Sequence, residues 1–130
     1  MILIVGEAPG RRGSRNLVDM LYEKTGVRLR NATYRNLLNV WPGSLGKGSG
    51  FPVERARDRA RRFRIRSHVT TVVIFGKRLA QAFDLSADYF EPVGRNGRRW
   101  IVVPHPSGVN AWWNDWVNCA QARVFLEGLN

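Results

Sequence analysis

The stretch "VTTVVIFG", residues 69–76, is the most strongly strand-forming part of the sequence. Valine, threonine, isoleucine and phenylalanine favour extended structure, and a nearly unbroken apolar run is typical of a strand buried on both faces. The next seven residues, "KRLAQAF" (77–83), continue as a short helix after Gly76. This pattern predicts a strand in the interior of a parallel sheet, followed at once by a helix.

Further strands are predicted on either side of this stretch. The run "ILIV" (2–5) is apolar throughout and is followed by a turn rich in glycine and proline, "GEAPGRRGS". The run "RRWIVVP" (98–104) follows the hairpin turn "GRNG" (94–97). A shorter strand is expected within "YRNLLNVWPG" (34–43), ending at Pro42.

Helical patterns alternate with these strands. The first helix is expected to begin at Ser14 as its N-cap, to carry Leu17, Met20 and Leu21 at helical spacing, and to stop at Gly26. The chain finishes on a tryptophan-rich helix within 111–129. Alternation of strands and helices predicts an α/β fold whose sheet is mostly parallel and covered by helices on both faces.

An arginine-rich helix is expected after Pro52, within "VERARDRARRFRIR" (53–66). Its apolar stripe would be Val53, Ala56, Ala60 and Phe63, and the remaining side chains are mostly charged. One interpretation is a solvated face on which Glu54 and Asp58 pair with arginines one turn on. The other is a nucleic-acid-binding surface, because seven arginines stand against two acidic residues.

Composition narrows the class of partner. The 130 residues are expected to form one domain, 1–130, with 21 Lys and Arg against 10 Asp and Glu, a net charge of +11. Such an excess attracts polyanions, of which nucleic acid is favoured over an anionic membrane. The apolar opening lacks the features of a signal peptide, and no run approaches the roughly 20 apolar residues of a spanning helix. We therefore expect a soluble cytoplasmic protein that does not bind membranes, and a monomer.

Cofactor and metal sites are not expected. The single cysteine, Cys119, excludes an internal disulfide, a cysteine-rich zinc site and a protein-held iron–sulfur cluster, and its surroundings suggest a small core residue. The segments "GEAPGRRG" and "GKGSG" lack the Gly-Lys-Ser/Thr of a phosphate-binding loop, and the first lacks dinucleotide-binding spacing. We predict neither a metal nor a cofactor.

Three loops should meet at one edge of the sheet: "GEAPG" (6–10), "WPGS" (41–44) and "HPSGVN" (105–110). Each follows a strand, and the carboxyl ends of parallel strands share an edge, where ligands bind. Glu7 could accept a proton from water, offset a developing positive charge or cap the next helix. His105 could donate to a developing anion, and Asn36 and Asn39 carry the paired donor and acceptor needed to read a base edge.

These motifs, in this order, resemble the uracil-DNA glycosylase superfamily. "GEAPG" and "HPSGVN" look like its two signature motifs, "NLLNVWP" like its base-reading strand, and "VVIFGKRLAQAF" like its apolar strand and helix. The resemblance spans nearly the whole chain and implies a three-layer α/β/α sandwich with a short, mainly parallel four-stranded sheet. It also implies a monofunctional, metal-independent glycosylase that flips uracil or a related pyrimidine out of DNA and hydrolyses its N-glycosidic bond.

The resemblance assigns roles to individual residues. Glu7 would position water and offset charge on the sugar, and His105 would hydrogen-bond O2 of the departing base. Base recognition would fall to Ala8 and Asn36, with Asn39 as the alternative to Asn36. The DNA-contacting residues would be Pro9, Gly10, Ser44, Ser107, Gly108 and Val109, the last as an apolar wedge that Trp112 and Trp113 extend unless they lie in the core.

The sequence departs from the family in three respects. Ala8 stands where the best-known members carry Asp or Asn, and the cysteines of the iron–sulfur branch, whose motif is "GEAPG", are missing. The segment that carries the base-stacking aromatic in that branch is shortened to "RRGSRN", which leaves Tyr34 as a candidate for this role. The alternatives are an inert glycosylase-fold module that binds DNA or protein, and a base- or nucleotide-modifying enzyme on the same scaffold.

Overall fold

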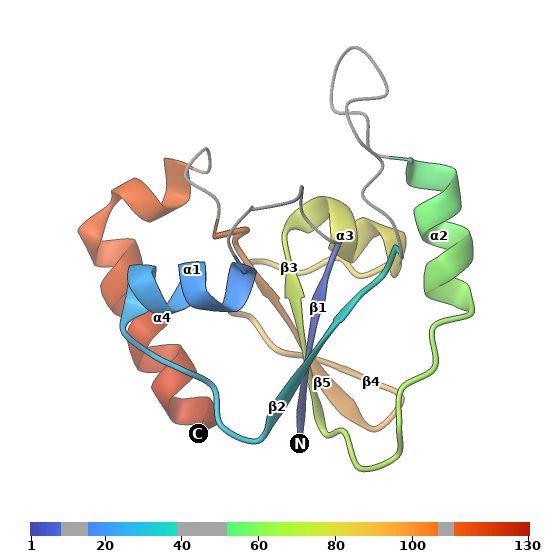
Figure 1. Cartoon of the computed structure of the whole chain (residues 1–130), viewed down its shortest axis with the longest axis horizontal. Helices are drawn as coiled ribbons and strands as arrows, with labels where there is room; N and C mark the ends of the chain where they lie inside the picture. The colour runs from blue at the N-terminus through green and yellow to red at the C-terminus, as the bar shows by residue number, and fades with distance from the viewer. Residues whose placement is uncertain (9–15, 39–51, 107–110) are drawn as a thin grey trace.

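A computed structural model describes residues 1–8, 16–38, 52–106 and 111–130. Within these residues the strands form one sheet in the order β2-β1-β3-β5-β4 (Figure 1). The strands are β1 (Ile2–Gly6), β2 (Ala32–Asn36), β3 (Thr71–Phe75), β4 (Val93–Arg95) and β5 (Arg98–Val103). Strands β2, β1, β3 and β5 run parallel to one another, and β4 is antiparallel to β5. The predicted mostly parallel α/β sheet is confirmed, with five strands in place of the four expected because the "GRNG" hairpin adds β4.

Helices cover both faces of the sheet, which gives the predicted three layers (Figure 1). One face carries α2 (Val53–Arg61) and α3 (Lys77–Ala82), and the other carries α1 (Leu17–Thr25) and α4 (Trp116–Leu129). A short 3₁₀ helix, η1 (Ala111–Asn114), precedes α4. Two apolar clusters lie between the sheet and these layers.

The central strands supply both clusters because neighbouring side chains of a strand point to opposite faces. In β1, Leu3 and Val5 pack toward α2 and α3, whereas Ile2 and Ile4 pack toward α1 and α4. All five residues of β3 are buried, as the unbroken apolar run predicts. In contrast, β2 is an edge strand in which half-buried and exposed residues alternate.

The first helix shows how local signals set its ends. Asn16 is its N-cap, and the Asn16 side chain accepts a hydrogen bond of 2.7 Å from the backbone N–H of Val18. The prediction of Ser14 as N-cap is therefore wrong by two residues. Gly26 ends the helix with φ 74°, as predicted, because glycine adopts this left-handed conformation without steric cost.

One other predicted boundary and one predicted core position are wrong. The β2 strand ends at Asn36 rather than at Pro42, because Asn36 pairs with Gly6, the last residue of β1, which is the neighbour of β2 among the described strands. In the arginine-rich segment the helix stops at Arg61, and Val53 is 51% exposed although it was expected on the apolar stripe. The remaining members of that stripe pack on the core as predicted.

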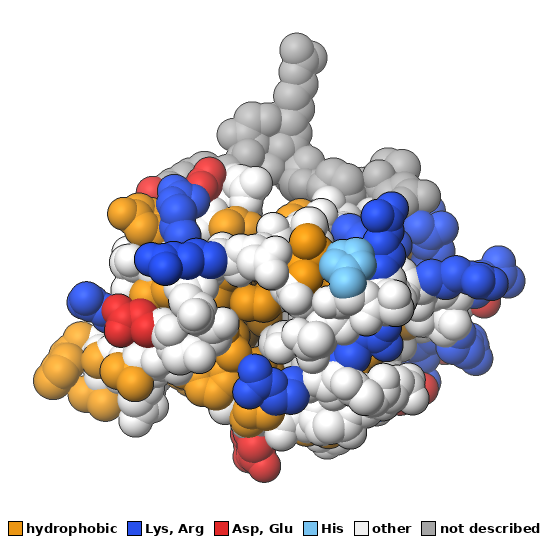
Figure 2. All heavy atoms as spheres, turned by 90° about the horizontal axis from the view of Figure 1, so that it is seen from below, with side chains coloured by type: hydrophobic (Ala, Val, Ile, Leu, Met, Phe, Trp, Pro, Cys, Tyr) orange, Lys and Arg blue, Asp and Glu red, His pale blue; other side chains and the backbone are white. Residues whose placement is uncertain are grey.

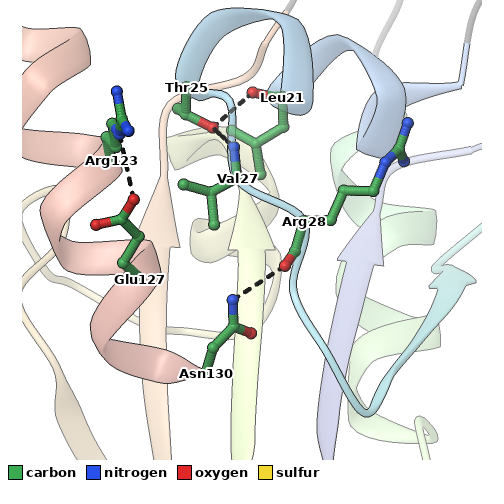
Figure 3. A network of polar contacts seen from close by, with 7 residues as sticks. All are labelled: Leu21, Thr25, Val27, Arg28, Arg123, Glu127 and Asn130. Carbon is green, nitrogen blue, oxygen red and sulfur yellow. Dashed lines mark hydrogen bonds and ion pairs between the residues drawn. The ribbon is translucent and has the colours of Figure 1, made fainter.

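Polar contacts join the layer of α1 and α4 to the chain that leads into β2 (Figure 3). The Asn130 side chain donates 3.0 Å to the carbonyl of Arg28 and accepts 2.7 Å from the backbone N–H of Arg30. Within α1, the Thr25 hydroxyl donates to the carbonyl of Leu21 and accepts from the N–H of Val27 (Figure 3). Among the described residues, no helix is long and apolar enough to cross a membrane.

Candidate active site

A cluster of polar side chains lies at the carboxyl edge of the sheet. Its members come from four places in the sequence and are called here the polar cluster: Glu7, Tyr34, Asn36, Arg78 and His105. Backbone hydrogen bonds extend the strand pairing past the strand ends and hold these segments together. The carbonyl of Glu7 accepts 2.8 Å from Leu38, and the carbonyl of Val103 accepts 2.8 Å from Gly76.

Glu7 is held by an arginine from α3. The Arg78 guanidinium donates from Nε to Oε2 of Glu7 and from Nη2 to Oε1 over 3.0 Å, so that both carboxylate oxygens are engaged. Glu7 is 13% exposed and Arg78 48%. A paired geometry of this kind fixes the orientation of a carboxylate as well as its charge. The N-cap of α1 is Asn16 and not Glu7.

Gly6 gives Tyr34 and Asn36 room to approach the end of β1. A β-carbon built on Gly6 would collide with the Tyr34 hydroxyl, would lie 2.8 Å from Tyr34 Cζ and would lie 3.0 Å from Asn36 Oδ1. The phenol and the amide oxygen therefore sit directly over a strand position that has no side chain. A larger residue at this position would require the Tyr34 side chain to shift.

Asn36 carries an unsatisfied oxygen. Its Oδ1 atom is buried and has no hydrogen-bond partner among the described residues. Leaving a buried acceptor unpaired costs about 1–3 kcal/mol, so native structures rarely do so without a functional or structural reason. This oxygen is available to a donor that a ligand brings.

The negative charge of Glu7 affects the pKa values of Tyr34 and His105. Burial, followed by the negative charge of Glu7, raises the pKa of Tyr34 to about 12, so the phenol stays protonated. Burial lowers the pKa of His105 below its ordinary value of 6.5, with Glu7 opposing the shift and Arg78 adding to it. His105 is therefore a neutral imidazole at neutral pH, with one ring nitrogen that donates and one that accepts.

A tryptophan of η1 holds the backbone of His105 in position. The Trp113 indole donates 2.9 Å to the His105 carbonyl, and the His105 β-carbon lies 3.8 Å from the position of a β-carbon on Gly76. The indole belongs to η1, and Gly76 lies in the turn after β3. The hydrogen bond from η1 thus fixes the His105 carbonyl.

The structure brings together Glu7, Asn36 and His105, which the sequence selected. Ala8 follows Glu7 and is half-buried. Of the other predicted contacts, Pro9, Gly10, Asn39, Ser44, Ser107, Gly108 and Val109 lie outside the described residues. Trp113 is 4% exposed and belongs to the core, as allowed for, and Trp112 packs against Tyr89, Phe90 and Trp113 rather than standing clear as a wedge.

Sequence reasoning missed Arg78. The signal was present, because Arg78 is the second residue of the helix that follows β3 and Gly76, at the same edge as Glu7. Spacing along the chain does not show that the two side chains meet across 71 residues. Among the described residues, no group of three or more His, Cys, Asp or Glu side chains is arranged to hold a metal ion.

Comparisons with known proteins add no family assignment: no family model and no curated protein sequence matches this chain.

Proposed function

We propose that the protein is a DNA glycosylase that flips uracil, or a related modified pyrimidine, out of DNA and hydrolyses its N-glycosidic bond. The proposal is carried by the meeting of Glu7, Asn36 and His105 at the carboxyl edge of the sheet, where the Asn36 oxygen has no partner among the residues that the structure describes. The same three residues occupy the matching places in the motifs that resemble the uracil-DNA glycosylase superfamily.

Asn36 suits the reading of a uracil edge. Its Oδ1 would accept from N3–H of the base and its amide nitrogen would donate to O4, whereas cytosine offers an acceptor and a donor in the reverse order. Because Oδ1 is buried, access of a base requires neighbouring side chains such as Tyr34 to shift. The base would then supply the hydrogen bond that this oxygen lacks.

Glu7 would stabilise the positive charge that develops on the sugar during hydrolysis, and His105 would stabilise the negative charge that develops on the base. The C1′–N1 bond breaks with its electron pair going to the base, the water oxygen bonds to C1′, and the proton that water loses ends on the base. The Glu7 carboxylate offsets positive charge on the sugar and orients the water. His105, neutral because its pKa is lowered, donates a hydrogen bond to O2 of the departing base.

One observation favours the inert binding module as a second candidate. Both oxygens of Glu7 are engaged by Arg78, which leaves fewer lone pairs for water than a carboxylate with a single partner. In that case the positive charge would bind DNA and the polar cluster would recognise a nucleotide without cleaving it.

Base release from a panel of oligonucleotides separates these candidates. The panel contains uracil, hydroxymethyluracil, hypoxanthine or thymine, each opposite G, opposite A and unpaired, and alkali reveals abasic sites. We expect release of uracil or hydroxymethyluracil by the wild type under single-turnover conditions. Release of none of these bases, with salt-sensitive binding intact, would overturn the glycosylase in favour of the binding module.

A further inference from the structure

The arginine-rich segment forms one wall of a groove that adjoins the polar cluster at Asn36. The groove has a volume of about 470 Å³ and lies between β2 and the segment that contains α2. We call it the arginine groove, and its main lining residues are Arg35, Asn36, Arg59, Arg62, Phe63 and Arg64. Its volume falls within the roughly 300–1,000 Å³ of ligand sites, but its lining is cationic rather than apolar.

Two of these arginines are held in place by the fold. The Arg35 guanidinium lies over the Phe63 ring, 4.0 Å from its centroid, and donates 2.7 Å to the carbonyl of Arg64. Arg59 donates from Nε to the carbonyl of Leu37 over 3.3 Å. A guanidinium whose position is set before binding loses less conformational entropy when it contacts an anion.

The other two arginines project into solvent. Arg62 is 78% exposed, and its guanidinium lies 3.5 Å from the carboxylate of Asp58 one turn earlier. This confirms the expected ion pair of Asp58. An exposed pair of this kind contributes little to stability, so Arg62 can exchange its partner for another anion. Arg64 is exposed as well, at the end of the same wall.

Charge is distributed unevenly between the two flanks of the sheet. Seven arginines and two acidic residues occupy 53–66, in and after α2. The opposite flank instead exposes apolar side chains of α4, with Trp116 at 80% and Val124 at 71%. Basic side chains accordingly gather toward the side of α2 and apolar ones toward the side of α4 (Figure 2). A polyanion is attracted to the α2 flank.

We propose that the arginine groove binds the sugar–phosphate backbone of a single DNA strand and leads that strand to the polar cluster. Proteins that bind a single strand use a cationic groove that follows the backbone, and the Arg35 guanidinium held over the Phe63 ring supplies a fixed positive charge in this groove. Asn36 lines the groove and is also a member of the polar cluster, so the two sites adjoin at this residue. The second half of this proposal, that the strand continues into the polar cluster, rests on the proposed function.

The test removes two groove charges and compares them with two matched charges elsewhere. The groove variant is Arg62→Gln with Arg64→Gln, and the control is Arg30→Gln with Arg99→Gln, whose exposed side chains lie at the amino edge of the sheet. Both double variants lower the net charge by the same amount. Fluorescence anisotropy measures binding of an undamaged 20-nucleotide strand and of the matching duplex over a range of salt, and circular dichroism checks the fold.

We expect the groove variant to bind the single strand roughly tenfold more weakly at low salt. The slope of log affinity against log salt concentration should fall in magnitude by about 1.4, because each of the two lost phosphate contacts to a single strand contributes about 0.7. The control should bind within about twofold of the wild type. Equal losses in the two variants would overturn the proposal, because they would show general charge attraction. A loss confined to the duplex would also overturn it, in favour of a duplex-binding surface.

A second measurement tests where the strand leads. Uracil-containing strands are lengthened stepwise on the 5′ or the 3′ side, and binding is followed to inactive Glu7→Gln protein with and without the groove substitutions. Affinity should rise with length on one side only, and the groove substitutions should abolish that rise. A rise on neither side, or one that the substitutions leave unchanged, would overturn the path. Because undamaged DNA tests the groove, failure of base release in the wild type would remove the glycosylase and leave the groove standing.

Discussion

The two edges of the same sheet use polar side chains in opposite ways. At the amino edge, Arg98 donates to three backbone carbonyls, those of Ile65, Arg66 and Val69, over 3.0–3.3 Å. The amino group of Met1 likewise donates to the carbonyl of His68. At the carboxyl edge, the buried Asn36 oxygen finds no partner within the described part of the chain, and the lowered pKa of His105 keeps it neutral beside an ion pair. Polar groups at the amino edge hold loops together, whereas at the carboxyl edge a buried acceptor has no partner among the described residues.

The two histidines give the largest expected contrast between the edges. His105→Ala should lower the single-turnover rate of base release by roughly 10²–10³-fold, because it removes a donor aimed at a developing anion. Affinity for uracil-containing DNA should stay within a few fold. His68→Ala is the matched control, since His68 is exposed at the amino edge and contacts Met1 Sδ at 3.1 Å. A similar loss of rate in both variants, or a large loss of affinity with the rate unchanged, would break the comparison.

Gly6 tests the packing of the carboxyl edge. In Gly6→Ala the new β-carbon would meet the Tyr34 hydroxyl, so the free energy of unfolding should fall by about 1–3 kcal/mol, as in other overpacked sites. Urea unfolding measures the change. Combining the substitution with Tyr34→Ala should cost less than the sum of the two single changes, because the collision is gone. Strict additivity of the two would contradict the close approach.

Arg98 tests the structural role of the amino edge. Arg98→Gln should lower the free energy of unfolding by about 1–2 kcal/mol, because it removes charge-assisted hydrogen bonds to three carbonyls. Base release per folded molecule should be unchanged. Arg99→Gln is the neighbouring control, because Arg99 is exposed on the same strand. Equal stabilities of the two variants would remove the distinction.

The smallest expected effect is a pH dependence of stability that comes from His105. Its pKa in the fold is below 6.5, so below about pH 6.5 the unfolded chain binds a proton more readily than the folded one. Stability from this group is therefore fully present above that pH and is lost as the pH falls through the lowered pKa. Thermal unfolding between pH 7 and pH 5 should show a smaller decline in His105→Gln than in the wild type. An identical decline would contradict a lowered pKa.

The sequence predicted most of the fold and the main residues of the site because both depend on local patterns. Unbroken apolar runs identify the central strands, and parallel strands require Glu7, Asn36 and His105 to share an edge. The strand end at Asn36 was missed because it depends on where the neighbouring strand stops. Arg78 and the approach of Tyr34 to Gly6 were missed because they are side-chain contacts between distant segments, which periodicity does not encode.

The most direct test of the carboxyl edge as a hydrolytic site is formation of abasic sites in a uracil-containing oligonucleotide by three proteins: wild type, Glu7→Gln and Arg98→Gln. We predict alkali-labile breaks at uracil with the wild type and with Arg98→Gln, and a loss of at least about a hundredfold in rate with Glu7→Gln. Breaks formed equally by Glu7→Gln, or by none of the three proteins, would contradict the account.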